Sequence, residues 1–274
     1  MKYSIKQFRT EFPNDDVCLD YIFAAKYPDL VGKYYRVKGR SSYANVSGDH
    51  LYPLVGTIFE HSSTPLTLWF YAIYLFSASK NGVSAKELER QLGVTYKCAW
   101  RIASKIRELM AGSGQKLTGT VEMDETYIGG KSANSRTKRK TYEDKAVVFG
   151  LVERGGQVVA EHVKSSGARV LLPAIAKSIE KTATLYSDSW RAYGKLKSQG
   201  YNHQSVNHLK NEWKRGSAHT NTIEGFWSQL KRSINGTYHV VSPKYPQAYV
   251  NEFAWRYNHR QLPYPAFAEL IAKV

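Results

Sequence analysis

The feature that most constrains this fold is the alternation of strand-like and helix-like segments after residue 119. A linker rich in glycine and polar residues covers 112–119. Beyond it, Gly155-Gly156 lies between two apolar segments and predicts a hairpin turn. The predicted order is strand, strand, strand, helix, strand, helix, strand, helix, over 120–128, 146–154, 157–163, 170–181, 183–187, 189–199, 201–206 and a helix from His219. Such an order predicts an α/β domain with one sheet covered by helices.

The helix from His219 to Arg232 has one apolar stripe and one polar edge. Its stripe consists of Ile223, Phe226, Trp227 and Leu230, whose spacing places them on one side of a helix. Beside the stripe lie three polar residues at helical spacing, Asn221, Glu224 and Lys231. Taken alone, this pattern equally fits an amphipathic surface helix with a solvated charged edge.

Two aspartates lie where strands are predicted, and they change this balance. Asp124 follows T-V-E-M in the first strand, and Asp188 directly follows the strand at 183–187. Thirty-five residues separate Asp188 from Glu224. Three acidic residues that are remote in the chain are therefore candidates for one shared site.

The sequence motifs around these residues resemble those of one protein family. The segments M-D-E-T-Y-I-G-G-K, Y-S-D-S-W-R-A-Y and H-T-N-T-I-E-G-F-W-S-Q-L-K-R-S-I-N-G-T-Y are similar to those of IS1595-family (ISXO2-like) insertion-sequence transposases of the DDE type. The similarity extends upstream into G-T-I-F-E-H-S-S-T-P-L-T-L-W-F-Y-A-I-Y-L-F and so covers most of the chain. It implies an RNase H-like catalytic domain with a mixed five-stranded sheet, an expectation that the predicted element order also supports.

The resemblance implies a two-metal site. In it, Asp124 bridges both ions, Asp188 and Glu224 bind one each, and Lys231 contacts DNA phosphate. Two Mg²⁺ (or Mn²⁺) ions are expected, because hard cations prefer oxygen ligands and converging carboxylates repel one another without them. Some family members have asparagine as the third residue, and Asn221 occupies that motif position. We favour Glu224 on its spacing, with Asn221 orienting water or DNA.

Four further residues near these motifs have both a functional and a structural explanation. Glu122 shares a strand face with Asp124 and is a lesser candidate for a metal ligand. His219 is a candidate base or phosphate contact. Trp190 and Trp227 could stack on an unpaired base, but a core role is favoured for Trp227.

Residues 1–60 predict a small module without metal. One or two short helices are followed by a hairpin-like stretch of aromatic and polar residues from Lys33 to Pro53. The family commonly carries a cysteine zinc ribbon here, but this chain has only Cys18 and Cys98. Two distant cysteines cannot provide the usual four ligands, so we expect a degenerate zinc-ribbon-like region and no zinc.

Residues 61–112 predict a helix-turn-helix module. Ser84 and Glu87 match a capping box, Gly93 permits a tight turn and Thr95 can cap a second helix. That helix would lie in the DNA major groove. Its candidate DNA contacts are Tyr96, Lys97, Arg101, Lys105 and Arg107. A helical hairpin that serves only as a scaffold is the alternative.

The charge balance favours a nucleic-acid partner. The chain has 39 Lys and Arg against 23 Asp and Glu, a net charge of +16, which suits a polyanion, although a merely basic protein has the same balance. Basic residues also gather in the loop at 131–145, where Lys138, Arg139 and Lys140 are predicted to bind phosphate. No secretory signal is visible, and the longest apolar run, 66–76, is too short to cross a bilayer. We therefore expect a soluble, cytoplasmic protein without membrane partners, nucleoid-associated if prokaryotic.

Together these features predict a DNA transposase. Its parts would be the ribbon-like module at 1–60, the helix-turn-helix module at 61–112 and the catalytic domain at 117–274. It would bind the terminal inverted repeats of its element and target DNA, and act as a homo-oligomer because two ends must be cut together. The main alternative is a catalytically inactive, transposase-derived DNA-binding protein. A general RNase H or repair nuclease is a third possibility, but would not need the helix-turn-helix.

Overall fold

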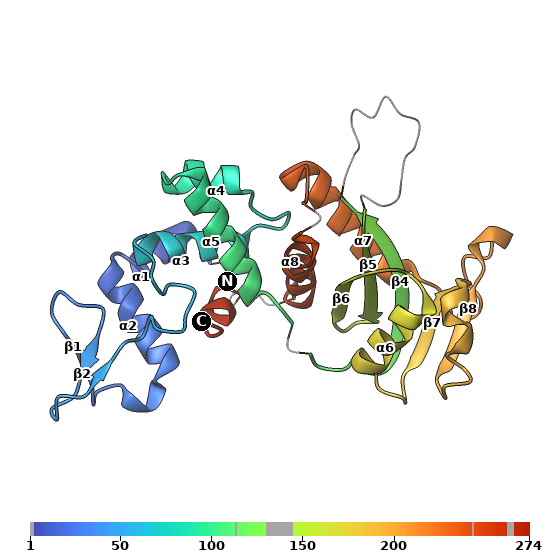
Figure 1. Cartoon of the computed structure of the whole chain (residues 1–274), viewed down its shortest axis with the longest axis horizontal. Coiled ribbons are helices and arrows are strands. Elements are labelled where there is room, and N and C mark those ends of the chain that lie inside the picture. Colours follow the sequence, from blue (N-terminus) through green and yellow to red (C-terminus); the bar gives the residue numbers. More distant parts are fainter. Residues whose placement is uncertain (1–2, 113, 130–144, 243, 262–265) are drawn as a thin grey trace. The chain divides into compact units, whose positions relative to one another are not determined.

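The chain forms two compact units in the computed structural model, which describes residues 3–112, 114–129, 145–242, 244–261 and 266–274. One unit combines residues 1–110 with 261–274, and the other spans 111–260 (Figure 1). We expected residues 117–274 to form one domain, but helix α9 (Ala266–Ile271) groups with the N-terminal unit. The reason is aromatic packing, since the Phe267 ring lies 5.4 Å from that of Phe12 and 5.7 Å from that of Phe70.

A five-stranded mixed sheet forms the centre of the second unit. Its strands lie in the order β6-β5-β4-β7-β8, with β4, β5 and β6 antiparallel and β4, β7 and β8 parallel. The bounds are β4 (Thr120–Ile128), β5 (Ala146–Glu153), β6 (Val158–Val163), β7 (Thr184–Asp188) and β8 (Asn202–Val206). All five predicted strands are present, and the mixed α/β architecture is compatible with an RNase H-like fold.

Helices cover both faces of this sheet. On one face, α6 (Ala168–Ser178) packs Leu171 and Ile175 against Val121 and Met123 of β4. On the other, α7 (Asn221–Ser233) packs Ile223, Phe226, Trp227 and Leu230 against β5 and β6, together with α8 (Pro246–Asn258). Because strand side chains alternate, the even-numbered residues of β4, including Asp124, face α7.

The free edge of β6 is closed by side chains of α8. Gln247 accepts a hydrogen bond from His162 N at 2.6 Å and donates to Ala160 O at 3.3 Å. Asn258 likewise accepts a hydrogen bond from Val158 N at 2.7 Å and donates one to Val158 O at 3.0 Å. Two amide side chains thus replace a neighbouring strand and protect the edge from pairing with another chain.

The first unit begins with short helices and a small sheet. It contains α1 (Ile5–Glu11), α2 (Asp15–Lys26), a 3₁₀ turn η1 (Pro28–Leu30), and the antiparallel strands β1 (Tyr35–Arg36), β2 (Tyr43–Ala44) and β3 (His50–Leu51). Tyr43 stacks on Phe23 at 3.9 Å between ring centroids and donates a hydrogen bond to Asp20. Aromatic packing therefore connects this sheet to α2.

Three helices complete the first unit: α3 (Leu66–Ala78), α4 (Ala85–Leu92) and α5 (Tyr96–Leu109). Ser84 caps α4, Gly93 adopts the left-handed conformation at φ 65°, and Thr95 caps α5, as predicted. The predicted capping box with Glu87 is not formed, because the Glu87 carboxylate accepts hydrogen bonds from Arg90 and Gln91. Arg107 is wrong as a DNA-contact candidate, because it is buried against the Phe76 ring and donates to Val83 O.

One predicted helix is much shorter than expected. The stretch 189–199 forms only a 3₁₀ helix η3 (Arg191–Lys195). Gly194 lies inside the predicted helix and disfavours it by about 1 kcal/mol relative to alanine. Beyond α7, the chain continues through a π-helical turn η5 (Ile234–Tyr238). In the described ranges, no helix has the length and apolar character to span a membrane.

Candidate active site

Asp124 and Asp188 lie on neighbouring parallel strands. Met123 of β4 pairs with Ser187 of β7, so the two aspartates follow at the same level. Both have the strand parity that faces α7. Asp188 ends its strand and accepts a hydrogen bond from the Trp190 backbone N–H at 3.0 Å. The parallel pairing therefore brings the two predicted acidic residues together.

Asp124 has an environment that disfavours its negative charge. Burial, together with the charges of Asp188 and Glu224, raises the pKa of this carboxyl to about 7. The Glu125 backbone and the Trp227 indole oppose the shift by hydrogen bonding, with Trp227 Nε1 donating to Asp124 Oδ2 at 3.0 Å. Three acidic side chains thus influence one another across β4, β7 and α7.

Helix α7 carries the remaining predicted site residues. Glu224 accepts a hydrogen bond from Thr220 Oγ1 at 2.7 Å and lies 3.8 Å from His208 Nε2. Asn221 is the first residue of the helix, Lys231 lies about two turns after Glu224, and both are exposed. Within the described residues, no three acidic, histidine or cysteine side chains are gathered closely enough to hold a metal ion. Asp124 and Glu224 are instead each engaged by a protein donor.

Glu122 joins α7 to the sheet. This fully buried carboxylate accepts hydrogen bonds from Thr222 N at 2.7 Å, Ile223 N at 3.1 Å and Thr222 Oγ1 at 2.8 Å. It also pairs with Arg154 at 2.7 Å and with His219 Nδ1 at 3.2 Å. A carboxylate at a helix N-terminus satisfies unpaired N–H groups and complements the helix dipole. Glu122 therefore serves as an anchor for α7, not as the additional metal ligand we considered.

His219 belongs to the same anchor. Arg154 donates to its backbone carbonyl at 3.2 Å, and its ring faces Glu122. Arg154 also stacks over the Tyr186 ring at 4.7 Å. These contacts hold the start of α7 against β4 at Glu122, two residues before Asp124.

The Trp227 indole reaches Asp124 because Gly150 leaves room for it. Gly150 pairs with Asp124 across β4 and β5. A Cβ atom at position 150 would lie 2.5 Å from two ring atoms of Trp227. Trp227 is buried, as predicted, but it also donates a hydrogen bond to the candidate site. Neither this hydrogen bond nor the role of Gly150 was predicted from the sequence.

The comparisons with known proteins agree with the motifs. The ISXO2-like transposase domain matches residues 116–258, which is more than half of the chain. This chain belongs to the ISXO2-like transposase family. The match covers all five strands of the sheet and the helices α6, α7 and α8.

Individual relatives of this ISXO2-like chain are also transposon proteins. An uncharacterized protein in transposable element ISH50 of Halobacterium salinarum is 31% identical over 198 residues, which is 66% of this chain and 66% of the relative, just under two thirds of its length. An uncharacterized transposase-like protein of Haemophilus influenzae is 26% identical over 105 residues, 38% of this chain and 81% of the relative. A simian T-cell lymphotropic virus intasome structure reaches a TM-score of only 0.32 at 14% identity, over 70% of this chain and 72% of that chain. That likeness is too low to support an argument.

Gly150 offers a direct test of the site geometry in this ISXO2-like domain. Gly150→Ala is expected to lower the free energy of unfolding by roughly 1–3 kcal/mol, because the buried Trp227 ring must move. Gly225→Ala in α7 is the matched control. Nothing lies within 4 Å of a Cβ there, so it should stabilise by up to about 1 kcal/mol. Urea unfolding measures both, and equal effects would contradict the close approach.

Glu125 is a partly buried carboxyl next to Asp124, and it lies on the opposite face of β4. Burial, together with the charges of Asp124 and Asp188, raises its pKa to about 8, and the Tyr193 hydroxyl opposes this shift. Neither Glu125 Oε1 nor the Tyr193 hydroxyl has a hydrogen bond of ordinary geometry among the described residues. Two consecutive residues in a strand face opposite sides of the sheet. The D-E pair in the motif was therefore the sequence signal that could have predicted a carboxyl on each face.

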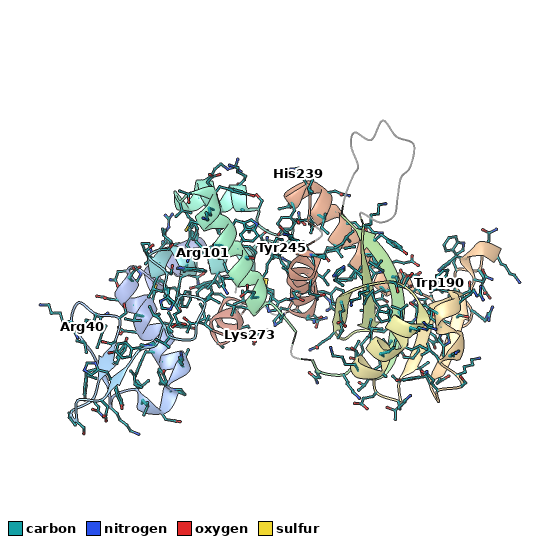
Figure 2. The ribbon with its side chains drawn as sticks, viewed as in Figure 1. Arg40, Arg101, Trp190, His239, Tyr245 and Lys273 are labelled. Carbon is teal, nitrogen blue, oxygen red and sulfur yellow. The ribbon has the colours of Figure 1, made fainter. Side chains whose placement is uncertain are left out.

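The predicted DNA-binding residues divide into two groups. Tyr96, Lys97 and Arg101 are exposed on α5, and Lys105 pairs with Glu108 at 2.8 Å. Arg101, labelled in Figure 2, also donates to Ser62 Oγ at 3.2 Å. The basic residues Lys138, Arg139 and Lys140 lie outside the described residues.

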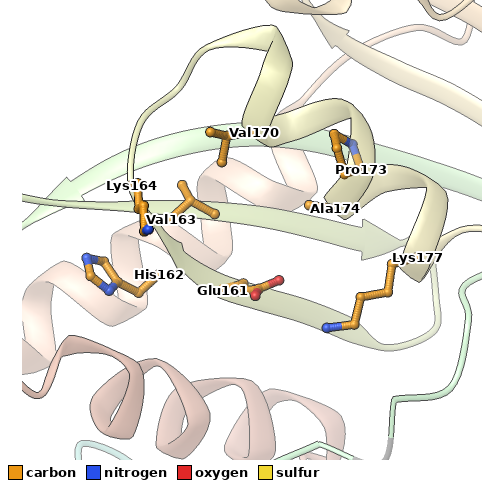
Figure 3. Close-up of a pocket in the computed structure, with 8 residues that line it drawn as sticks. All are labelled: Glu161, His162, Val163, Lys164, Val170, Pro173, Ala174 and Lys177. Atoms are coloured by element: carbon orange, nitrogen blue, oxygen red, sulfur yellow. The ribbon is translucent and has the colours of Figure 1, made fainter.

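A surface pocket of the second unit is separate from these acidic residues. It lies between β6 and α6 and is lined by Glu161, His162, Val163, Lys164, Val170, Pro173, Ala174 and Lys177 (Figure 3). Its β6 residues Glu161 and Val163 face α6, whereas Asp124 faces α7. The pocket therefore contributes nothing to the candidate active site.

Proposed function

We propose that this ISXO2-like chain is a DNA transposase that cuts and joins DNA strands by metal-dependent phosphodiester chemistry. One observation carries the proposal: Asp124 and Asp188 end up side by side on parallel strands, on the face where α7 carries Glu224. Membership of a transposase family supports it. On this proposal the sheet with α6, α7 and α8 is an RNase H-like catalytic domain.

The donor set fits hard divalent cations. Asp124, Asp188 and Glu224 offer carboxylate oxygens, the ligands that Mg²⁺ and Mn²⁺ prefer. Burial raises the pKa of Asp124 and repulsion by the other two carboxylates adds to this shift, so a bound cation would stabilise the charged form. When bound, two such ions activate an oxygen nucleophile and stabilise the leaving oxygen. Glu224 Oε1 accepts from Thr220 Oγ1, which leaves Oε2 to take part, while Glu122 keeps α7 in place.

The remaining parts of the proposal concern DNA binding. The turn between α4 and α5 would act as a helix-turn-helix, with Tyr96, Lys97, Arg101 and Lys105 facing DNA. The basic residues Lys138, Arg139 and Lys140 would bind phosphate, and Lys231 would contact phosphate near the cut. The protein would act as a homo-oligomer on element ends and target DNA in the cytoplasm. No specific observation favours the alternative of an inactive DNA-binding descendant.

The first test is cleavage of DNA that carries element ends. The parent chain should nick it with Mg²⁺ or Mn²⁺, and Asp188→Asn should reduce the rate by roughly 10³-fold or more, since several kcal/mol of charge stabilisation are lost. Glu161→Gln, a carboxylate on the opposite sheet face, should cut normally. Cutting by the parent in EDTA, or undiminished cutting by Asp188→Asn, would refute metal chemistry at this site. A parent that binds but never cuts would favour the inactive DNA-binding protein.

The same assay decides the third residue. Glu224→Gln should lose cleavage to the same extent as Asp188→Asn, because a neutral amide is a much weaker ligand than a carboxylate. Asn221→Ala should retain most of the activity and change DNA affinity instead. The reverse result would assign the third position to Asn221.

A further inference from the structure

The loop between β8 and α7 presents an exposed tryptophan beside the candidate active site. Trp213 has 60% of its surface exposed. Its ring packs on the His208 imidazole with centroids 4.7 Å apart and planes inclined by 37°. A large indole left in solvent forgoes burial, yet this one is held in a defined position by a neighbouring ring.

His208 connects this indole to the acidic residues. Its Nε2 lies 3.8 Å from Glu224 Oε1 and 3.4 Å from Thr220 Oγ1, the group that donates to Glu224. A ligand seated on Trp213 would therefore lie within one side chain of Glu224. If Glu224 acts as proposed, a ligand at this position would lie next to the reacting phosphate.

The loop is built to hold this shape. Glu212 accepts a hydrogen bond from Asn207 N at 3.1 Å and two from the Arg215 guanidinium, both at 2.7 Å. Arg215 and Ala218 exchange two backbone hydrogen bonds at 2.9 Å. Trp213 lies between the hydrogen-bonded residues Glu212 and Arg215, so its backbone is constrained without a ligand.

The charges around Trp213 indicate what it binds. Lys210 and Lys214 are exposed in the same short loop. An aromatic face combined with nearby cations is the arrangement that binds unpaired nucleotides, with bases stacked on the ring and phosphates beside the cations. A structural role explains His208 packing but not an exposed indole between two lysines.

We propose that Trp213, supported by His208, is a stacking platform for an unpaired base at the DNA strand end next to Glu224. The inference rests on the proposed function, because it deepens the description of that same site. It assigns Trp213 a positioning role: the indole orients the strand end and takes no part in bond breaking.

The test compares DNA ends in EDTA, where no cleavage occurs. The probes are a blunt duplex and the same duplex with a three-nucleotide single-stranded overhang, with binding followed by fluorescence anisotropy of the full chain. Trp213→Ala should weaken binding of the overhang probe by roughly 5- to 100-fold, as expected for lost base stacking, and leave the blunt duplex nearly unchanged. Trp213→Phe should restore most of the affinity, since it keeps an aromatic face.

Two controls make the result specific. The first control is an overhang made of abasic sites, which has no bases to stack. The parent should bind it as weakly as Trp213→Ala binds the ordinary overhang. Trp213→Ala should bind the abasic and ordinary overhangs with equal affinity. Tyr245→Ala removes another exposed aromatic residue of this unit and should not discriminate between the probes (Tyr245 is labelled in Figure 2). Equal losses on blunt and overhang DNA, or no loss, would overturn the proposal. Because binding is measured without divalent ions, its outcome is independent of the Asp188→Asn cleavage result.

Discussion

Glu122→Ala is expected to lower the free energy of unfolding by about 3–5 kcal/mol, because it removes a fully buried carboxylate and leaves the partly buried Arg154 guanidinium without this partner. The substitution also leaves two backbone N–H groups at the start of α7 without their acceptor. Since α7 carries Glu224, cleavage should be lost together with stability. Urea unfolding followed by circular dichroism measures the effect.

Two further variants separate anchoring from charge in general. Glu122→Gln keeps an acceptor oxygen and should fall between the parent and the alanine variant. Glu180→Ala removes a half-exposed carboxylate 3.8 Å from Lys116, and a surface pair of this kind contributes less than about 1 kcal/mol. If Glu122→Ala costs no more than Glu180→Ala, Glu122 does not anchor α7.

Asp124→Asn is expected to stabilise the metal-free protein at pH 8. Folding raises the pKa of Asp124 from 3.8 to about 7. This difference corresponds to at most about 4 kcal/mol, as each pKa unit is worth about 1.4 kcal/mol. Asparagine removes the buried charge and keeps an acceptor oxygen for the Trp227 indole. The gain should be accompanied by loss of cleavage.

The pH dependence of this gain has a definite sign. A carboxyl with a higher pKa in the folded state contributes its full stability below about pH 4, and this contribution is lost as the pH rises towards 7. Asp124→Asn should therefore match the parent near pH 4 and exceed it increasingly up to pH 7. Asp29→Asn, an exposed aspartate, is the control and should show no such trend.

Magnesium should narrow the stability difference between the two proteins. If the carboxylates hold Mg²⁺, the ion stabilises the parent by about 2.7 kcal/mol at a hundredfold excess over its dissociation constant, and the variant much less. Thermal unfolding at pH 8 with EDTA and with Mg²⁺ compares them directly. A parent that does not respond to Mg²⁺ would contradict metal binding at Asp124.

Much of the second unit follows from local patterns. Apolar segments separated by turn signals predicted all five strands, because such local patterns are present in the sequence itself. The apolar stripe of α7 was predicted residue by residue and is buried. The same local rules failed at 189–199, where Gly194 weakens the helix. They also could not assign Phe267 to the N-terminal unit, since that depends on aromatic partners far away in the chain.

For the site, the residue types and spacing already indicated Asp124, Asp188 and Glu224 as candidates, because their positions in predicted strands and a predicted helix can be recognised in the sequence. Their surroundings depended on contacts across about a hundred residues. Glu122 became the anchor of α7, and Trp227 reached Asp124 through the space above Gly150. A carboxylate that caps a helix and one that faces a cluster of charges look alike in sequence. Only the packing of α7 on β4 and β5 distinguishes them, since it determines which donors each oxygen meets.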